Sequence, residues 1–382
     1  MHVYKTEISA HTKNKNKIEQ FENYLSINLT RVQHLLETKT VKFNSYFIFL
    51  IQEPKYRIVM SQTIKDKLIN HLVARYIVLE AFENSLIDAN VATRKDRGTH
   101  YGRQLLQKYI LELKKEKKEI YYLKCDIRKY FYNINHEVLK KILRTKIKDK
   151  DALELLDKII ESAQNPKITE DIEKVCQKEI ERVQKLNISE KEKRQKIENI
   201  NHIPRLNIKG RGIPIGNMTS QAFAIIYLNE LDHYIKEKLH IKYYLRYMDD
   251  FVLLSTDKKR LQECKKIISK KLETEYQLEL NPKTQIGLLK NGLDFLGFRF
   301  ILQNNKLYLK LRTQVKKRFK RRMKYLYHKC LKGEISKEKF QNVKGSYYGH
   351  LLPGNTHYLW KNITDKYNME ELPNDIGKKV KI

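Results

Sequence analysis

Two adjacent aspartates, Asp249 and Asp250, lie between short apolar stretches and are the residues best suited to chemistry. The flanking stretches, residues 243–245 and 251–254, predict a strand–turn–strand with both acids at its tip. Like charges this close repel each other, and burial penalises the charged form of both. A divalent metal ion is the simplest compensation for that cost. The alternative is a solvated hairpin tip, because Asp-Asp pairs are common in turns.

A third aspartate, Asp126, ends another predicted strand, which covers residues 119–127. This carboxylate could reach the same sheet edge as Asp249 and Asp250. Three carboxylates there would hold two Mg²⁺ ions about 3.5–4 Å apart, which stabilises the attacking and leaving oxygens of phosphoryl transfer. The additional aspartate and the flanking strand pattern favour this metal site over the solvated turn.

The elements that must position these aspartates are short strands and helices along one chain. A helical pattern runs through Ile64, Leu68, Leu72 and Ile77, and a further helix is predicted to open at residues 135–137. Residues 210–216 predict a loop. Other predicted strands are 46–51, 277–280 and 293–300, and other predicted helices are 219–239, 257–274 and 311–332.

Residues 145–205 differ in composition from the rest of the chain, because they are rich in Lys and Glu and contain no aromatic residue. Their apolar residues recur at helical spacing and predict one stripe on a helix. The stripe consists of Ile168, Ile172, Cys176, Ile180 and Val183. We interpret the segment as a helical insertion. It could be a solvated hairpin that merely connects two parts, or a surface for RNA or a protein partner.

The composition points to a polyanionic partner. The chain has 382 residues and a formal net charge of +32, and its mass is 45.9 kDa. This length suggests two or three packed units. A strongly positive protein binds nucleic acid because neutralising phosphates releases counterions. The alternative is a general Lys bias in coding, but residues 311–332 concentrate ten Lys and Arg without an acid.

Several other classes of protein are not indicated. The apolar runs are far shorter than the roughly 18 residues that would span a bilayer. The first residues have no apolar signal-peptide core, so we expect a cytoplasmic protein without a membrane partner. The four cysteines form no CxxC pair, which argues against a zinc site or a disulfide framework. The sequence contains no P-loop, HExxH or GxSxG motif.

Several motifs resemble those of reverse transcriptases. Residues 247–250 are similar to the YxDD motif, and residues 126–131 are similar to the aspartate motif that precedes it. The resemblance continues in order through residues 55–57, 94–100, 212–221, 280–284 and 295–298, and so extends over residues 46–300. Its collinear order distinguishes it from chance agreement.

The subfamily that the chain resembles is the bacterial reverse transcriptases of diversity-generating retroelements. Residues 215–221 have the form IGxxxSQ that is typical of that group, where most relatives carry QGxxxSP. Residues 346–350 and 355–357 also resemble its C-terminal segment. Related bacterial antiphage-defence reverse transcriptases share much of this pattern. A group II intron-type protein would normally add maturase or endonuclease segments, for which little chain remains after residue 332.

The resemblance implies an α+β fold of the right-hand polymerase type, with fingers, an antiparallel-sheet palm and a helical thumb. The expected divisions are an N-terminal segment with fingers (1–115), a first part of the palm (116–144), the helical insertion (145–205), the rest of the palm (206–300) and a basic thumb with the C-terminal segment (301–382).

The resemblance also implies roles for individual residues. The catalytic and metal-binding residues would be Asp126, Asp249 and Asp250, with the Ile127 carbonyl as a further metal ligand. The nucleotide-binding residues would be Arg57, Lys55, Lys65, Phe131, Ile215, Gly216 and Lys283. The primer grip would comprise Phe295, Leu296, Gly297 and Phe298. The nucleic-acid-binding residues of the thumb helix would be Lys316, Lys317, Arg318, Lys320, Arg321, Arg322 and Lys324.

Three of these roles have a specific chemical basis. The planar guanidinium of Arg57 suits the triphosphate. Phe131 stands where the family places the ring that blocks a ribose 2′-hydroxyl. Ile215 replaces a glutamine that can hydrogen-bond around the nascent pair, so we expect low fidelity, especially opposite adenine. Ile215 could instead be a neutral packing choice.

The implied function is cDNA synthesis from a structured noncoding RNA template, with deoxynucleotides and two Mg²⁺ ions, for which Mn²⁺ could substitute. An accessory protein partner is compatible with this activity. The biological role would be mutagenic copying in a diversity-generating retroelement or, alternatively, antiphage defence. A remote alternative is a catalytically inactive RNA-binding scaffold, against which the intact Asp126, Asp249 and Asp250 argue.

Overall fold

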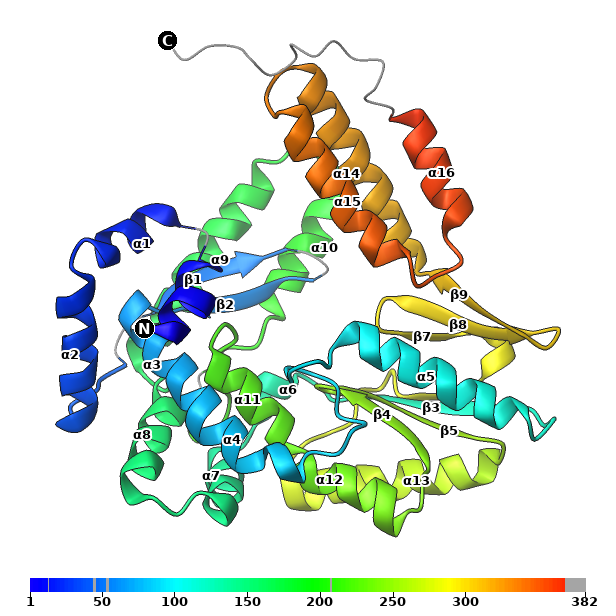
Figure 1. The fold of residues 1–382 in the computed structure, drawn as a ribbon, viewed down its shortest axis with the longest axis horizontal. Helices are drawn as coiled ribbons and strands as arrows, with labels where there is room; N and C mark the ends of the chain where they lie inside the picture. The colour runs from blue at the N-terminus through cyan, green and yellow to red at the C-terminus, as the bar shows by residue number, and fades with distance from the viewer. Residues whose placement is uncertain (13, 44–45, 53–54, 207, 368–382) are drawn as a thin grey trace.

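The computed structural model describes residues 1–12, 14–43, 46–52, 55–206 and 208–367 (Figure 1). The α-helices are α1 (Lys15–Glu22), α2 (Leu25–Glu37), α3 (Ile64–Val73), α4 (Glu80–Phe82), α5 (Thr99–Lys114), α6 (Tyr130–Asn133), α7 (His136–Lys146), α8 (Lys150–Glu161), α9 (Pro166–Gln184), α10 (Glu190–Asn201), α11 (Met218–Tyr227), α12 (Asn229–His233), α13 (Lys258–Lys271), α14 (Thr313–Leu331), α15 (Lys337–Leu351) and α16 (His357–Lys366). Shorter helical turns are η1 (Tyr4–Ser9), η2 (Ala74–Leu79), η3 (Glu83–Ser85), η4 (Tyr234–Lys238), η5 (Leu272–Tyr276) and η6 (Leu289–Asn291). The strands are β1 (Phe47–Ile51), β2 (Arg57–Ser61), β3 (Tyr121–Asp126), β4 (Tyr243–Tyr247), β5 (Asp250–Ser255), β6 (Gln285–Leu288), β7 (Leu293–Phe295), β8 (Phe298–Gln303) and β9 (Lys306–Leu311). The fold is α+β, as the sequence predicts.

A four-stranded antiparallel sheet, in the order β4-β5-β3-β6, carries the aspartates. Successive side chains of a strand point to opposite faces, so β3 contributes to two separate cores. Leu123 and Cys125 pack in a core that includes α11 and α13, whereas Tyr122 packs in a second core with α5. Figure 1 shows α5 and α13 on opposite sides of this sheet. Helices therefore cover both of its faces.

A polar cap fixes the start of the helix that follows the Asp126 motif. The side chain of Asn135 accepts a hydrogen bond from the Val138 amide at 3.0 Å, which satisfies one of the free donors at the start of α7. Leu139 and Leu143 then face the core. The predicted helix start at residues 135–137 is confirmed.

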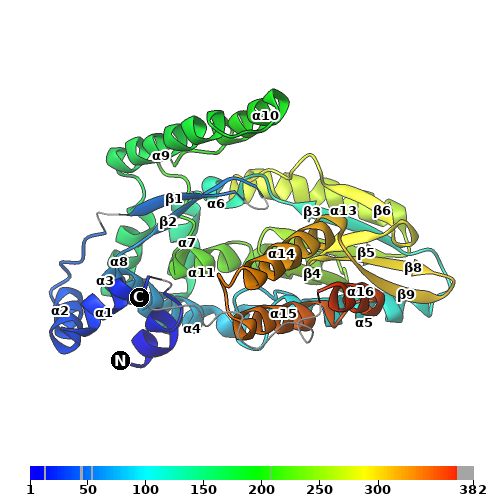
Figure 2. The same ribbon diagram turned by 90° about the horizontal axis from the view of Figure 1, so that it is seen from above.

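Residues 145–205 contain α8, α9 and α10, and Figure 2 shows α9 and α10 lying along one side of the molecule beside β1 and β2. The predicted stripe lies on α9, and four of its five members are buried: Ile168, Ile172, Cys176 and Val183. They share a hydrophobic cluster with Ile58 and Met60 of β2. The segment is therefore not a hairpin solvated on all sides, because its apolar face packs on the β1–β2 hairpin.

The C-terminal part begins with a three-stranded antiparallel sheet, β7-β8-β9, which leads into α14. Figure 1 shows α14, α15 and α16 grouped together above this sheet. Phe319, Met323, Leu326 and Cys330 recur at helical spacing on α14 and form a buried stripe. Val315 is only partly buried. Residues 368–382, the end of the predicted C-terminal division, lie outside the described residues.

Three predicted elements are wrong in detail. The strand expected over residues 293–300 is instead the hairpin of β7 and β8, with a turn at residues 296–297. The single helix expected over residues 219–239 is divided at Leu228 into α11, α12 and η4. The strand expected over residues 277–280 does not form, since Gln277 has a positive φ of 53° and Leu280 makes only an isolated bridge with Ile127. The strand that pairs with β3 on the side away from β5 is β6, a few residues after the predicted one. Short apolar runs do not by themselves define where pairing begins.

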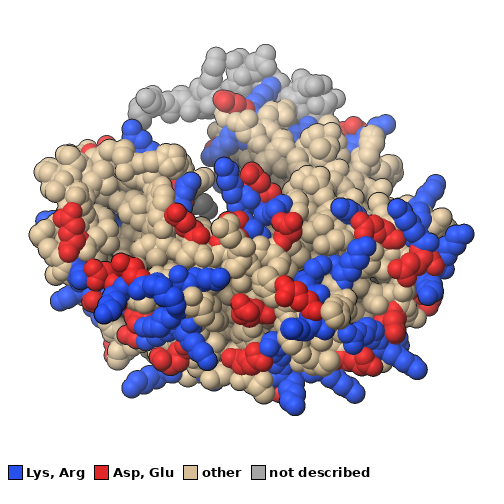
Figure 3. Space-filling view, turned by 60° about the horizontal axis from the view of Figure 1, so that its bottom comes forward, with Lys and Arg blue, Asp and Glu red and all other residues tan. Residues whose placement is uncertain are grey.

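The exterior carries both signs of charge. On the face shown in Figure 3, Lys and Arg side chains are spread among Asp and Glu rather than gathered in one place. The cysteines are inside, because Cys125, Cys176, Cys264 and Cys330 are all buried and free. Within the described ranges, no helix combines the length and the apolar character that crossing a membrane would need.

Candidate active site

Strand pairing brings the three aspartates to one edge of the central sheet. Asp126, the last residue of β3, is directly opposite Asp250, the first residue of β5. Asp249 lies in the turn between β4 and β5, and its carbonyl accepts a hydrogen bond from the Ile127 amide at 3.2 Å. Residues more than a hundred positions apart are thus held together by backbone pairing. This pairing brings the three aspartates to one edge of the sheet, as predicted.

A buried charge pair supports the turn that carries Asp249 and Asp250. The Arg246 guanidinium bonds both carboxylate oxygens of Asp232, through Nε at 2.7 Å and Nη2 at 2.6 Å. Both side chains are fully buried. Burial alone would lower the pKa of Arg246, but the charge of Asp232 raises it above its ordinary value. The guanidinium therefore stays charged inside the protein.

The same guanidinium reaches the tip of the turn. Its Nη1 donates to the Met248 carbonyl at 3.0 Å, and Nη2 donates to the Ile225 carbonyl of α11 at 2.8 Å. Met248 has a φ of 57°, an unfavourable value for a residue with a side chain. Arg246 thus ties a strained turn to α11 and, through Asp232, to α12. The sequence interpretation missed this role, although an arginine within an apolar strand was a visible signal.

The surroundings raise the pKa of all three aspartates. Burial, followed by the charge of Asp126, raises the pKa of Asp249 from 3.8 to about 6. Burial is also the main cause that raises the pKa of Asp250 from 3.8 to about 7. The pKa of Asp126 is raised in the same direction by burial. A cation bound among these carboxylates would be stabilised, because its charge favours their ionised form.

The donor chemistry of the site fits a hard divalent cation. Oδ1 of Asp250 is buried and has no hydrogen-bond partner among the described residues. Its Oδ2 is 3.3 Å from the Lys124 ammonium, and Oδ2 of Asp126 accepts from the Asn281 amide at 2.8 Å. Oxygen-only ligands are those that Mg²⁺ prefers. In the part of the chain that the structure describes, no three His, Cys, Asp or Glu side chains are grouped closely enough to form a metal centre by themselves.

Cationic side chains from distant segments surround this edge. The charge of Arg57, at the start of β2, lowers the pKa of Asp249. The charges of Lys55 and Lys283 lower the pKa of Asp126, so both lie within its electrostatic reach. Lys65 differs from these three, because its ammonium lies 3.4 Å from its neighbour Asp66.

The predicted nucleotide-contacting apolar residues come from two segments. Phe131, in α6, is partly buried and contacts the ring of Tyr130 edge to face, with ring centroids 5.8 Å apart. Tyr130 belongs to the core and donates to the Ala224 carbonyl at 2.6 Å. Ile215 is held by the Met60 amide, which donates to its carbonyl at 2.8 Å.

Gly216 follows Ile215 and is required by its conformation. Its φ of 131° is disfavoured for other residues, and an added Cβ would lie 2.6 Å from the Met60 carbonyl oxygen. A side chain at position 216 would therefore separate the Ile215 segment from β2.

The four residues of the predicted primer grip form the tight β7–β8 hairpin. Phe295 and Phe298 pair directly and are fully buried, so their rings serve the core. Leu296 and Gly297 form the turn, with φ values of 46° and 86°. Glycine is favoured at position 297 by this positive φ alone. Space is not the reason, because, apart from its chain neighbours, no described atom lies within 4 Å of an added Cβ. Leu296 and Gly297 are partly exposed, so the turn is the accessible part of this hairpin.

The seven basic residues predicted on the thumb helix all lie on the exposed side of α14. They are Lys316, Lys317, Arg318, Lys320, Arg321, Arg322 and Lys324. The opposite side of α14 packs on α15 and α16 through the buried stripe. The helix therefore presents a dense positive surface to solvent while one face anchors it.

An antiparallel sheet that carries three aspartates at one edge, within an α+β framework, defines a polymerase fold. Residues 51–300 match the family model "Reverse transcriptase (RNA-dependent DNA polymerase)", and the chain belongs to this family. Members of the family are RNA-directed DNA polymerases and generally use a divalent metal ion. No curated protein matches the chain.

Solved structures of telomerases show distant similarity. Apo telomerase from Candida Tropicalis, truncated from its C-terminal domain, has 15% sequence identity and a TM-score of 0.47, covering 70% of this chain and 55% of that one. Telomerase from Candida albicans in complex with a TWJ fragment of telomeric RNA has 15% identity and a TM-score of 0.44, covering 81% and 54%. The corresponding complex from Candida Tropicalis has 14% identity and a TM-score of 0.47, covering 88% and 58%. The chain thus spans little more than half the length of these proteins.

Proposed function

We propose that the chain copies an RNA template into cDNA from deoxynucleotides. The observation that carries this proposal is the register of β3 and β5, which sets Asp126 opposite Asp250 with Asp249 in the adjoining turn. Membership of the reverse transcriptase family supports the same activity.

The aspartates are the proposed metal ligands, together with the Ile127 carbonyl. Two Mg²⁺ ions, or Mn²⁺ in their place, would supply charge neutralisation for the triphosphate and activation of the primer 3′-hydroxyl. Lys124 lies 3.3 Å from Oδ2 of Asp250, which leaves Oδ1, an oxygen without a hydrogen-bond partner among the described residues, as the atom that would bind a metal ion. The Asn281 amide, 2.8 Å from Asp126, orients that side chain throughout.

The surrounding residues have proposed roles in holding the nucleotide. Arg57, which is exposed and near enough to influence Asp249, would bind the triphosphate, with Lys55 as a second cation. Lys283 would stay near the leaving pyrophosphate. Phe131 would exclude a ribose 2′-hydroxyl by its bulk. Lys65 would contribute only if it leaves Asp66.

We assign the regions of the hand by their position relative to the aspartates. Residues 1–115, with β1 and β2, would form the N-terminal segment and fingers, and residues 116–144 and 206–300 would form the palm around the central sheet. Residues 145–205 would be an insertion that packs on the fingers hairpin. Residues 301–382 would form the thumb and C-terminal segment, with α14 following the template–primer duplex.

Replacing Asp249 tests the central proposal. Asp249→Asn should reduce primer extension on an RNA template by about a thousandfold, because one charged metal ligand is lost. Binding of the template–primer, measured by fluorescence anisotropy, should be unchanged. Asp365→Asn, at an exposed position of α16, is the matched control and should leave extension intact. Undiminished extension by Asp249→Asn would overturn the mechanism.

We infer low fidelity and a role in a diversity-generating retroelement from residues 215–221. Ile215 is partly buried and offers no hydrogen bond from its side chain, so geometry around the nascent pair is less tightly selected. Ile215→Gln should lower misincorporation, above all opposite adenine, in sequenced extension products. An unchanged error rate would contradict this inference. Antiphage defence is the rival role, and a neighbouring variable-protein gene with template and variable repeats would decide against it.

The proposed template is a structured noncoding RNA that remains bound to the protein. The exposed basic residues of α14 support such a partner, because A-form duplexes are recognised through shape and backbone. Sequencing the RNA that copurifies with the protein, and the DNA made from it, would identify the template. An accessory protein would appear in the same purification.

A further inference from the structure

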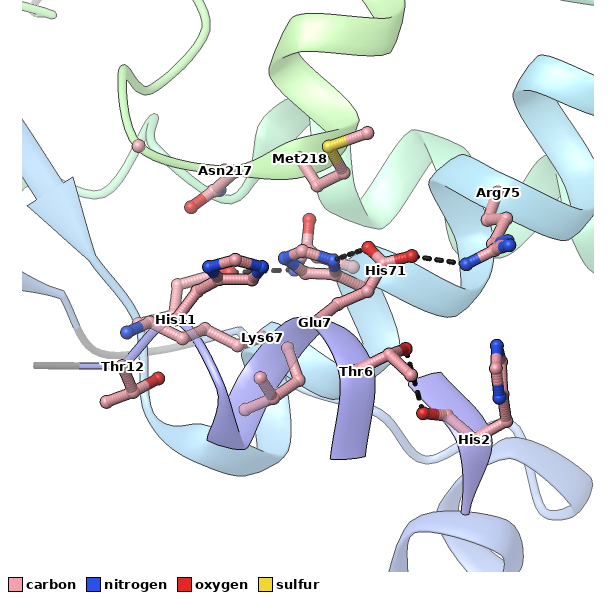
Figure 4. Close-up of a pocket in the computed structure, with 14 residues that line it drawn as sticks. His2, Thr6, Glu7, His11, Thr12, Lys67, His71, Arg75, Asn217 and Met218 are labelled. Atoms are coloured by element: carbon pink, nitrogen blue, oxygen red, sulfur yellow. Dashed lines mark hydrogen bonds and ion pairs between the residues drawn. The ribbon is translucent and has the colours of Figure 1, made fainter. Parts of the chain in front are cut away.

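A cavity of about 640 Å³ lies between the N-terminal helical turn η1, helix α3 and the segment that begins α11. Figure 4 shows the side chains that line it, which come from all three segments. Its volume is within the range of small-molecule sites, about 300–1,000 Å³. Of the sequence motifs, only residues 212–221 reach it, through Gly216, Asn217 and Met218.

The lining is rich in cationic and imidazole side chains. They are His2, His11, Lys67, His71 and Arg75. Glu7 is the acid of the lining, and it is already paired, with His71 Nδ1 at 2.8 Å and with the Arg75 guanidinium. Burial alone would raise the pKa of Glu7, but its bonds and charge interactions with His71 and Arg75 lower it. The acid is therefore neutralised within the wall of the cavity.

Lys67 is the cation without such a partner. Among the described residues, no hydrogen bond or ion pair holds its ammonium, although the side chain is only partly exposed. Burial, followed by the nearby charge of Lys17, lowers the pKa of Lys67. A partly buried ammonium beside a second cation gains from an anion in the cavity.

The rest of the lining can complete an anion site. Asn70 is fixed within the wall, where its amide donates to Gln62 Oε1 at 2.8 Å and its Oδ1 accepts from Thr219. Asn217 and Met218, at the start of α11, also line the cavity. Asn217 brings a polar side chain to the wall beside the charge of Lys67.

We propose that this cavity binds a phosphate group carried by a nucleotide, with Lys67 and His11 as the principal contacts. The chemistry is the same for a free nucleotide and for one nucleotide of a single-stranded RNA. The volume admits a nucleotide as well as its phosphate. The site is separate from the aspartates and would hold its ligand without divalent metal.

Binding by the full chain in EDTA tests the proposal with two probes. One probe is adenosine monophosphate, measured by calorimetry, and the other is a short labelled single-stranded RNA, measured by anisotropy at several salt concentrations. Lys67→Met should weaken at least one probe about tenfold, and should reduce the salt slope for RNA by about 0.7 if a strand phosphate is lost. Lys67→Arg should keep the affinity within about twofold, because it retains the charge. A loss of affinity for RNA alone would identify an RNA strand as the ligand, whereas a loss of affinity for adenosine monophosphate would identify a free nucleotide as the ligand.

A matched control is Lys236→Met, because Lys236 is likewise partly buried and its pKa is also lowered by burial and a neighbouring lysine. It should bind both probes like the parent. His11→Ala provides a second test within the cavity and should weaken the same probe several-fold, which keeps the proposal testable if Lys67→Met fails to fold. Unchanged affinity for both probes in Lys67→Met and His11→Ala, or an equal loss in Lys236→Met, would overturn the proposal. Because metal is removed, this result is independent of polymerisation.

Discussion

The β4–β5 turn and helix α14 use charge in opposite ways. At the turn, Arg246 and Asp232 are fully buried and bonded to each other at 2.6 Å. On α14, the seven basic residues from Lys316 to Lys324 are exposed. A buried charge must have one partner at one position, so it fixes geometry, whereas exposed charges act as a sum that salt can screen. The proposed catalytic centre therefore depends on individual residues, whereas the proposed RNA-binding surface depends on the number of its basic residues.

The largest effect is expected when one member of the buried Arg246–Asp232 pair is removed. Arg246→Met should destabilise the protein by about 3–5 kcal/mol, because it leaves the Asp232 carboxylate buried without its partner. It should also reduce primer extension at saturating substrate, because Met248 loses the bond that holds its carbonyl at 3.0 Å. Urea unfolding and steady-state kinetics measure the two effects.

A second substitution separates stability from positioning. Arg246→Met combined with Asp232→Leu removes the orphaned charge and should recover most of the stability, yet extension should stay low. If extension recovers together with stability, Arg246 has no positioning role.

Protonation of the buried aspartates gives the next largest effect. The pKa values of Asp249 and Asp250, about 6 and about 7, lie above the value of 3.8 for an unfolded aspartate. Their contribution to stability is therefore present below pH 3.8 and is lost as the pH rises through 6 and 7. Because Mg²⁺ binds only the ionised carboxylates, its affinity should fall as the pH is lowered below 7.

Thermal melting with and without Mg²⁺ measures this linkage. The increase in Tm caused by Mg²⁺ should be larger at about pH 8 than at about pH 6. In the double variant Asp249→Asn/Asp250→Asn, the increase should be small at both values. An equal Mg²⁺ effect at both values in the parent protein would show that these carboxylates do not bind the ion.

The smallest effect is expected from a single charge on α14. Lys320→Gln should weaken template–primer binding only a few-fold and reduce the salt slope by about 0.9, because one phosphate contact is lost. The triple variant Lys316→Gln/Lys320→Gln/Lys324→Gln should reduce the salt slope by about three times that amount, with little change in Tm. Anisotropy across a salt series is the measurement. A large loss from Lys320→Gln alone would mean that α14 acts through one specific contact.

Much of the fold and of the candidate site could be predicted from local sequence. The apolar stretches around Asp249 and Asp250 define β4 and β5, and the strand ending at Asp126 was predicted on the same grounds. The stripe on α9 and the basic face of α14 follow from helical spacing. Such features are readable because side-chain periodicity is set by the backbone of each element alone.

Other features depend on contacts between distant segments. The edge strand beside β3 is β6 and not the expected strand at residues 277–280, because Gln277 has a positive φ that breaks the extended backbone there. The role of Arg246 depends on Asp232 of α12 and Ile225 of α11 lying beside the turn. The cavity around Lys67 exists only because the N-terminal turn packs beside α3. Sequence alone determined the residue types, the charge and the aspartate motifs, whereas the tertiary structure decided their partners, because burial and pairing are properties of the whole packed chain.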